Sequence, residues 1–183
     1  MKKTILIFGL ISGALSSLMM VATVPLMHDN GFDRGYVIGY TAIVLSFLLV
    51  FFGIRSYRDN VGHGQITFAR GFAVGICITL ISCVFYVATW EVLYFTVMHD
   101  FMDKYSAYMV GKLQASGASA TAIQAKLEEM KKFKAMYENP FFNVAMTFIE
   151  PFPVGLGITL ISAAVLRKKP QAQMAQTPVA AAR

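Results

Sequence analysis

Two acidic residues inside apolar stretches are the side chains of this sequence best suited to chemistry. Glu91 and Glu150 each interrupt a long run of uncharged, mostly hydrophobic residues. A charge inside a membrane span costs about 2.5–3.5 kcal/mol on insertion scales, so such groups usually face a protein interior. At 1.5 Å of rise per helical residue, Glu91 lies about 10 Å before the end of its run and Glu150 about 14 Å after the start of the next run. These two ends lie on the same expected side of the membrane, so the two residues have similar depths. We therefore expect both carboxyl groups to face a shared polar space, where one holds a proton or the pair shares a cation. The alternative is a structural bundle in which each carboxyl group is hydrogen-bonded and takes part in no transport.

Two prolines lie within three residues after Glu150, at Pro151 and Pro153. Proline has no backbone N–H, so the carbonyl groups of Thr147 and Ile149 lose their helical partners, and the helix must kink or break. Broken helices at membrane depth often line cavities, although purely structural helices contain them too. The candidate polar site inside the membrane therefore comprises Glu91, Glu150, Pro151, Pro153 and Thr147.

The remaining reactive side chains form no recognised site. His28 and Asp29 end one apolar run, and His99 and Asp100 end another on the same expected side. Their spacing is not a ligand motif, so we expect no metal site. The two cysteines, six residues apart in one run, lie on different helix faces and suit packing rather than a disulfide. The sequence also lacks a nucleophile elbow, a Walker loop, HExxH and CxxC. We therefore expect neither an enzyme nor a bound cofactor.

Charged connectors divide the sequence into four apolar runs, 4–27, 35–54, 71–98 and 141–166. Runs of about 20 residues match a hydrocarbon core about 30 Å thick. The sequence therefore predicts an all-α polytopic membrane protein with four transmembrane helices in one domain, 1–169. The first run also resembles a secretory signal, but its length favours a retained anchor. Residues 170–183 lack periodic apolar positions and are expected to form a disordered cytoplasmic tail.

The distribution of basic residues predicts the orientation. Lys and Arg cluster at alternate span ends, and only Arg34 lies in the first connector on the other side. Both termini should therefore be cytoplasmic, and this placement fits topology better than binding of nucleic acid by a chain of net charge +6. The connector 99–140 is contrary evidence, because it carries six lysines although it should lie outside; five acidic residues accompany them. On the cytoplasmic side, we expect membrane-interface anchoring by Arg55, Tyr57, Arg58 and Arg70.

The connector 99–140 carries apolar residues at helical spacing on both sides of a small, flexible stretch at 115–120. This pattern predicts two extracytoplasmic amphipathic helices between the third and fourth spans. Thr121 followed by Gln124 suggests a capping box at the start of the second helix. The segment either lies along the membrane surface, caps the bundle, or binds a partner through 100–138.

Glycines four residues apart mark three of the spans, and this spacing lets helix backbones approach closely. We expect helix packing at Gly9, Gly13, Gly35, Gly39, Gly71 and Gly75, either within one chain or in a homo-oligomer. In addition, residues 67–82 match 147–162 without gaps at ten of sixteen positions. Such an echo is either the trace of an inverted repeat, as found in many transporters, or a coincidence of apolar sequence.

Several of these stretches together resemble one known family. They are FFGIRSYRD at 51–59, GQITF at 64–68, YENP at 137–140 and FIEPFPVG at 148–155, with the glycine-bearing third run. They resemble the bacterial membrane family catalogued as domain of unknown function 4199, over about residues 1 to 168. The resemblance implies four spans. It brings no activity, ligand or catalytic residue. We expect a multi-pass protein of the bacterial inner (cytoplasmic) membrane.

Three functions remain as hypotheses. The leading one is a non-enzymatic structural or accessory component of the envelope, with 100–138 as its interaction surface. The alternative is a small proton- or cation-coupled transporter that uses the intramembrane carboxylates. A lipid-modifying enzyme is third, with only the carboxylates and histidines in its favour. The expected partner in every case is the lipid bilayer, with no nucleic acid.

Overall fold

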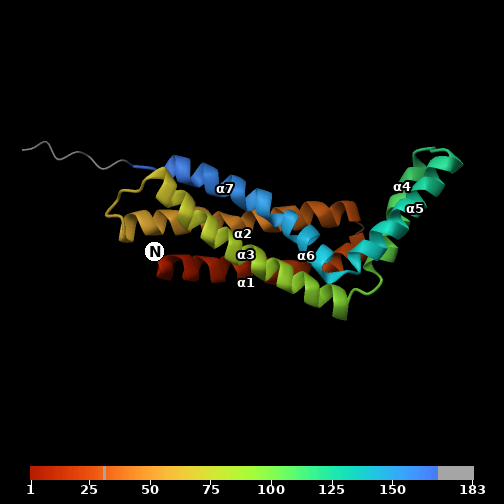
Figure 1. Cartoon of the computed structure of the whole chain (residues 1–183), viewed down its shortest axis with the longest axis horizontal. Helices are drawn as coiled ribbons and strands as arrows, with labels where there is room; N and C mark the ends of the chain where they lie inside the picture. The colour runs from red at the N-terminus through yellow and green to blue at the C-terminus, as the bar shows by residue number, and fades with distance from the viewer. Residues whose placement is uncertain (31, 169–183) are drawn as a thin grey trace, which may run out of the picture.

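The computed structural model describes residues 1–30 and 32–168, with side chains for all of these except 24–30. Within this part of the chain the structure is helical, which confirms the predicted class (Figure 1). The helices are α1 (Lys2–Asn30), α2 (Phe32–Asn60), α3 (Phe68–Thr96), α4 (Phe101–Ala115), α5 (Ala120–Tyr137), α6 (Pro140–Ile149) and α7 (Pro151–Leu166). Four stretches are long and apolar enough to cross a membrane: Lys2–Thr23, Phe32–Asn60, Phe68–Thr96 and Pro140–Leu166. The predicted tail, 170–183, lies outside the described residues.

The four spans form a bundle, and α4 and α5 form a hairpin that projects from one end of it (Figure 1). We call this end the hairpin end. The N-terminus and the α2–α3 connection lie at the opposite end, which we call the terminal end. Helix α1 packs on α2 and α3, and α7 packs on α3 and α2. At the terminal end, Ile66 and Lys168 exchange backbone hydrogen bonds of 3.1 and 2.9 Å, which join the α2–α3 connection to the residues after α7.

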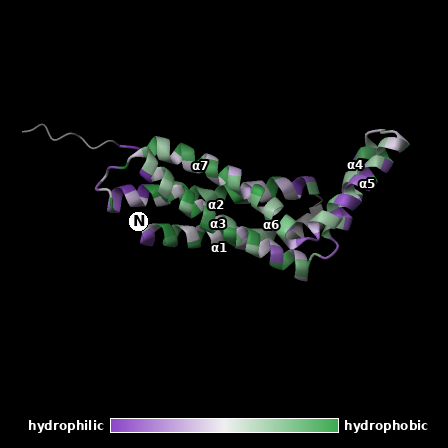
Figure 2. Cartoon of the chain, in the orientation of Figure 1, coloured by the Kyte–Doolittle hydropathy of each residue, from purple (hydrophilic) through white to green (hydrophobic). Residues whose placement is uncertain are grey.

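The bundle has an apolar outside, as expected for helices in lipid. Figure 2 shows hydrophobic residues along the four spans and hydrophilic ones at the bundle ends and on the hairpin. Val37, Val84 and Val165 are all more than 60% exposed. The interior, in contrast, contains buried hydroxyl groups such as those of Ser12 and Ser46, and Ser12 donates to the Ser46 carbonyl at 2.9 Å. Small polar residues between helices are typical of membrane bundles, where burial of apolar area provides no drive for association.

The contact between α3 and α7 is reciprocal. A Cβ added at Gly75 would lie 2.7 Å from Cγ2 of Thr159, and one added at Gly155 would lie 2.5 Å from Cγ2 of Thr79. The two threonine hydroxyls lie 3.0 Å apart and share a hydrogen bond. Gly75 matches Gly155, and Thr79 matches Thr159, in the sixteen-residue sequence echo, whose two copies are offset by eighty residues. The echo therefore corresponds to a locally two-fold symmetric contact, in which each helix offers the other the same surface.

The predicted break in the fourth span is present. Helix α6 ends at Ile149 and α7 begins at Pro151, with Glu150 at the junction. Glu150 keeps helical dihedral angles, φ −70° and ψ −59°, so the junction is a kink and not an unwound segment. The proline ring removes the hydrogen bond that would have joined the two helices here.

The two helices predicted in the connector are α4 and α5. Gly117 takes a positive φ of +77° in the turn between them. The N-cap of α5 is Ser119, whose hydroxyl accepts from the Ala122 amide at 3.3 Å, so the capping box predicted at Thr121 is wrong. Lys134 Nζ and Asp103 Oδ1, 2.6 Å apart, join the two helices. The Asp103 carboxylate raises the pKa of Lys134.

Candidate functional site

A cavity of about 370 Å³ lies in the half of the bundle nearest the hairpin. This volume is within the range of small-molecule sites, roughly 300–1,000 Å³. Every helix except α7 contributes to its wall. Eight lining side chains are aromatic: Tyr36, Tyr40, Tyr86, Trp90, Phe101, Tyr105, Phe133 and Tyr137.

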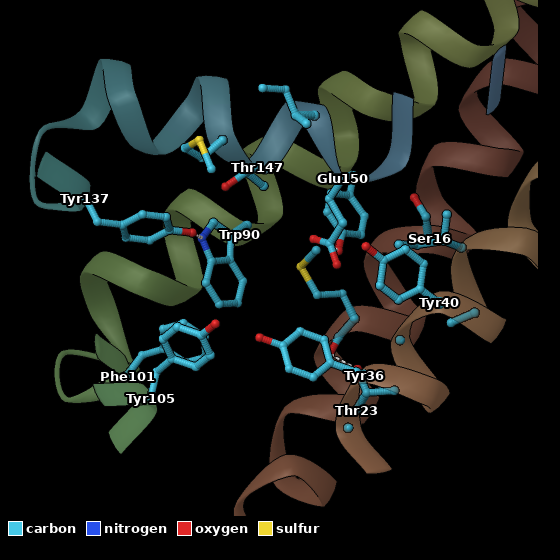
Figure 3. A pocket seen from close by; sticks show the side chains of 18 of the residues that line it. Ser16, Thr23, Tyr36, Tyr40, Trp90, Phe101, Tyr105, Tyr137, Thr147 and Glu150 are labelled. Atoms are coloured by element: carbon cyan, nitrogen blue, oxygen red, sulfur yellow. Dashed lines mark hydrogen bonds between the residues drawn. The ribbon is translucent and has the colours of Figure 1, made fainter. Parts of the chain in front are cut away.

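Glu150 is the one acidic residue among those that line the cavity in the described structure. The kink places it between α6 and α7, and Figure 3 shows its carboxyl group turned into the cavity. Its described hydrogen bond comes from the Tyr86 hydroxyl, which donates to Oε2 at 2.9 Å. No Lys, Arg or His belongs to the described lining. A buried carboxylate without a basic partner is costly, so this group must hold a proton or attract a cation.

A polar network fixes the wall opposite the α1–α2 side. Asn143 is fully buried, and its Oδ1 accepts from Trp90 Nε1 at 3.1 Å and from Thr147 Oγ1 at 3.1 Å. Trp90 Nε1 also donates to the Tyr137 hydroxyl at 3.0 Å. These bonds hold α3, α5 and α6 together and orient the indole ring toward the cavity. Thr147, which the sequence placed in the site, does line the cavity.

The base of the hairpin covers the end of the cavity. Figure 3 shows the rings of Tyr36 and Tyr105 with their hydroxyl groups turned toward each other. The hairpin is attached to the start of α2 through Asp33, which accepts from the Tyr108 hydroxyl and from Lys112 Nζ, the latter at 3.1 Å. Phe32 adds a ring contact to Tyr105, with centroids 5.6 Å apart. The connector was expected either to lie on the membrane surface or to cap the bundle. In the structure, the base of the hairpin caps the bundle.

The comparisons with known proteins give one match. The family model described as "Protein of unknown function (DUF4199)" matches residues 7–168. The chain belongs to the DUF4199 family. Among curated proteins and solved structures, no match was found. The site of this DUF4199 protein must therefore be interpreted from its own chemistry.

Glu91 does not share the cavity with Glu150. It is not a lining residue, whereas its neighbour Trp90 is. Successive helical residues are rotated by roughly 100°, so both cannot point the same way. Glu91 is half-buried at the edge of the packed face of α3. Val84 and Phe95, seven before and four after it, are 64% and 41% exposed, whereas Val87 and Tyr94, four before and three after it, are buried. Its Oε1 atom is buried with no hydrogen-bond partner among the described residues. The expected shared space for two carboxyl groups is therefore wrong for this DUF4199 protein.

The other residues of the predicted polar site have separate positions. Pro151 is fully buried, and Pro153 is exposed. Neither lines the cavity. Their effect is on the backbone, since they produce the kink that turns Glu150 inward.

The glycine pairs divide into contacts and a cavity wall. Added Cβ atoms at Gly9 and Gly13 would clash with Ile81 and Phe85 of α3, at 2.9 and 2.7 Å. Gly71 lies in ordinary contact with Ala163 of α7. These pairs pack as predicted.

Gly35 and Gly39 differ, because both line the cavity and a Cβ added at Gly39 would have nothing within 4 Å. Gly39 therefore makes no helix contact within this chain, because α2 faces the cavity there. Packing of Gly39 in a homo-oligomer stays a prediction. The sequence did not indicate the close-packed Gly155, nor Trp90, Tyr137 and Asn143 as site residues. The tyrosines of α2, one turn apart at 36 and 40, were a usable signal for an aromatic wall.

At the terminal end, the predicted anchoring residues of this DUF4199 protein have mixed positions. Arg55 and Arg70 are exposed, and Arg58 pairs with Asp59 at 2.7 Å. Tyr57 is only 6% exposed, so it belongs to the core and not to the lipid interface. The described residues contain no group of three or more His, Cys, Asp or Glu that could hold a metal ion, and the side chains of His28 and Asp29 lie outside them.

Proposed function

We propose that this protein is a non-enzymatic membrane carrier whose cavity binds a small molecule. One observation carries this proposal: the carboxyl group of Glu150 enters an aromatic-lined cavity at a kink between two half-helices. Kinked or broken helices beside an ionisable group form the binding sites of many transporters. The coupling ion in the proposal is a proton or another cation, held at Glu150.

The two halves of the bundle differ in packing, as expected for a carrier that is closed on one side of its binding site and hollow on the other. Toward the terminal end, the interior is filled, and Val50, Ile54, Val74 and Ile78 have no exposed surface. The Thr79–Thr159 hydrogen bond and the two glycine contacts join α3 and α7 beside this core. Toward the hairpin end, the interior is hollow. Alternating access would require the α3–α7 contact to loosen while the hairpin end closes.

The proposed location is the bacterial inner membrane, with both termini cytoplasmic and the hairpin outside. Basic residues at the terminal end support this orientation, since cytoplasmic ends of spans carry excess Lys and Arg. Reporter fusions at Gly62 and Gly117 test it, and they should give cytoplasmic and extracytoplasmic signals respectively. The reverse pattern would overturn the orientation.

Filling the cavity tests the binding function directly. Gly39→Phe should place a ring in the open space beside Gly39, whereas Gly157→Phe adds the same ring on α7 at a glycine that also has open space around it. Trp90 is the only tryptophan of the chain, so its fluorescence reports on the cavity alone. In nanodiscs, acrylamide should quench Trp90 in the parent protein and in Gly157→Phe, but at least threefold less in Gly39→Phe.

The same two variants test the function in cells. Gly39→Phe should fail to complement a deletion strain, while Gly157→Phe should succeed at equal expression. If Gly39→Phe complements fully, the cavity is dispensable. That result would favour the second candidate, an accessory envelope protein or homo-oligomer that acts through 100–138. The projecting hairpin, with exposed charged residues such as Glu128 and Lys131, is the observation in its favour.

A further inference from the structure

We propose that the cavity selects a hydrophobic organic cation, namely an ammonium group that carries alkyl or aryl substituents. This inference rests on the proposed binding function and adds the class of ligand. It follows from the charges and the surfaces of the cavity-lining side chains.

The charge of the cavity favours a cation. Glu150 is the one carboxyl group of the described lining, and no basic side chain of the described residues balances it there. Its neighbours are phenols, which donate hydrogen bonds but carry no positive charge. Tyr86 bonds to Oε2 at 2.9 Å, and Figure 3 shows the Tyr40 hydroxyl directed toward the same carboxyl group. A monovalent cation would supply the missing charge, whereas an anion would meet repulsion.

The surface of the cavity favours an organic cation over an inorganic one. Metal cations need several oxygen ligands, about six for Mg²⁺ and six to eight for Ca²⁺, and a single carboxylate among phenols is a poor match. Aromatic ring faces carry negative charge density and attract cations whose own substituents are apolar. Trp90, Tyr36 and Tyr105 lie beyond the carboxyl group in Figure 3, where the substituents of such a cation would rest.

A neutral apolar molecule fits less well. It would fill the aromatic part and leave a proton on Glu150, so the charge of the carboxyl group would take no part in recognising it. Hydrogen bonds to Asn143 and Tyr137 also hold the indole ring of Trp90 in one orientation. A fixed indole ring favours a ligand group that contacts it in a defined position, as a cation on an aromatic ring does. An organic cation therefore interacts with both the carboxyl group and the aromatic rings of the cavity, whereas a hydrocarbon interacts with the rings alone.

A matched pair of probes tests the class of ligand on the unmodified protein. Benzyltrimethylammonium and neopentylbenzene have nearly the same shape, and only the first is charged. In nanodiscs of phosphatidylethanolamine, the cation should change Trp90 fluorescence and give a dissociation constant at least tenfold below that of the neutral compound. Equal affinity for the two would overturn the inference.

Substitutions then locate the charge. Glu150→Gln should lower the affinity for benzyltrimethylammonium at least tenfold and change the affinity for neopentylbenzene by less than twofold. Circular dichroism checks that the variant is folded. Unchanged cation affinity in this variant would also overturn the inference. If both probes bind equally and Gly39→Phe abolishes both, the carrier proposal survives with a different ligand. If neither probe binds and acrylamide fails to reach Trp90, the carrier proposal itself fails.

The ammonium group can come from two sources, a free solute or a lipid headgroup. Nanodiscs of phosphatidylcholine and phosphatidylethanolamine have the same net charge, but only choline is a quaternary ammonium. Weaker binding of benzyltrimethylammonium in phosphatidylcholine would identify the headgroup as a competitor for the site. Equal binding in both lipids would show that the choline headgroup does not compete for the site, which favours a free solute as the source.

Discussion

At the scale of single residues, the two intramembrane acids have different roles despite similar depth. Depth along a helix follows from residue number, so the sequence predicted it for both. Direction depends on rotation about the helix axis and on where the neighbouring helices lie, and the sequence provides only the first. Trp90 faces the cavity and Glu91, the next residue, does not. The candidate site was therefore half predictable: Glu150 and Thr147 belong to it, and Glu91 does not.

Glu91→Leu tests this distinction. Because Glu91 is half-buried and its Oε1 atom has no hydrogen-bond partner among the described residues, leucine should remove the cost of burying that polar atom and raise the free energy of unfolding by about 1–3 kcal/mol. Complementation and Trp90 quenching should stay at parental levels. Glu150→Leu is the matched contrast and should lose complementation. Equal loss in the two variants would show that the carboxyl groups act together after all. Unfolding in mixed detergent micelles measures the stability change.

At the scale of elements, glycine spacing indicated which helices approach closely but not which partner each one meets. The glycine pairs of α1 and α3 pack as expected, whereas that of α2 faces open space at Gly39. The sequence alone cannot distinguish a glycine in a helix contact from a glycine in a cavity wall. The space left by the absent side chain of glycine can hold either a neighbouring helix or a ligand. The sequence echo between 67–82 and 147–162 has a structural counterpart, because matched residues of its two copies meet across α3 and α7.

Two glycines of α7 give opposite predictions for the same substitution. An alanine Cβ at Gly155 would lie 2.5 Å from Thr79 and 2.8 Å from Phe47, so Gly155→Ala should destabilise by about 1–3 kcal/mol. Gly157→Ala meets nothing within 4 Å and should stabilise by up to about 1 kcal/mol, because alanine is the better helix former. Unfolding midpoints in mixed detergent micelles measure both. A similar shift for the two variants would contradict the close α3–α7 contact.

At the scale of the whole molecule, the number of spans was predictable and the cavity was not. Each span is encoded locally, by a run of apolar residues long enough for the bilayer. The cavity is formed by side chains from six helices, and its end is covered by a hairpin whose angle to the bundle depends on contacts far apart in sequence. Asp33 and Tyr108 are 75 residues apart, and Asp33 and Lys112 are 79 apart. Residue patterns within a single helix cannot predict contacts between residues so far apart in the sequence.

These contacts make the hairpin a candidate cover that opens and closes. Asp33 links α2 to α4 through two exposed side chains, and the Asp33 carboxylate raises the pKa of Lys112, so the lysine stays charged at neutral pH. Because exposed pairs contribute little to global stability, Asp33→Ala should leave the unfolding midpoint nearly unchanged. It should nevertheless loosen the hairpin base and increase acrylamide quenching of Trp90 at least twofold. Glu128→Ala is the control, since its partner Lys131 lies on the same helix and does not attach the hairpin to the bundle. Equal quenching in Asp33→Ala and Glu128→Ala would mean that the link through Asp33 does not govern access, and that Phe32 and the ring contacts around it hold the cover in place.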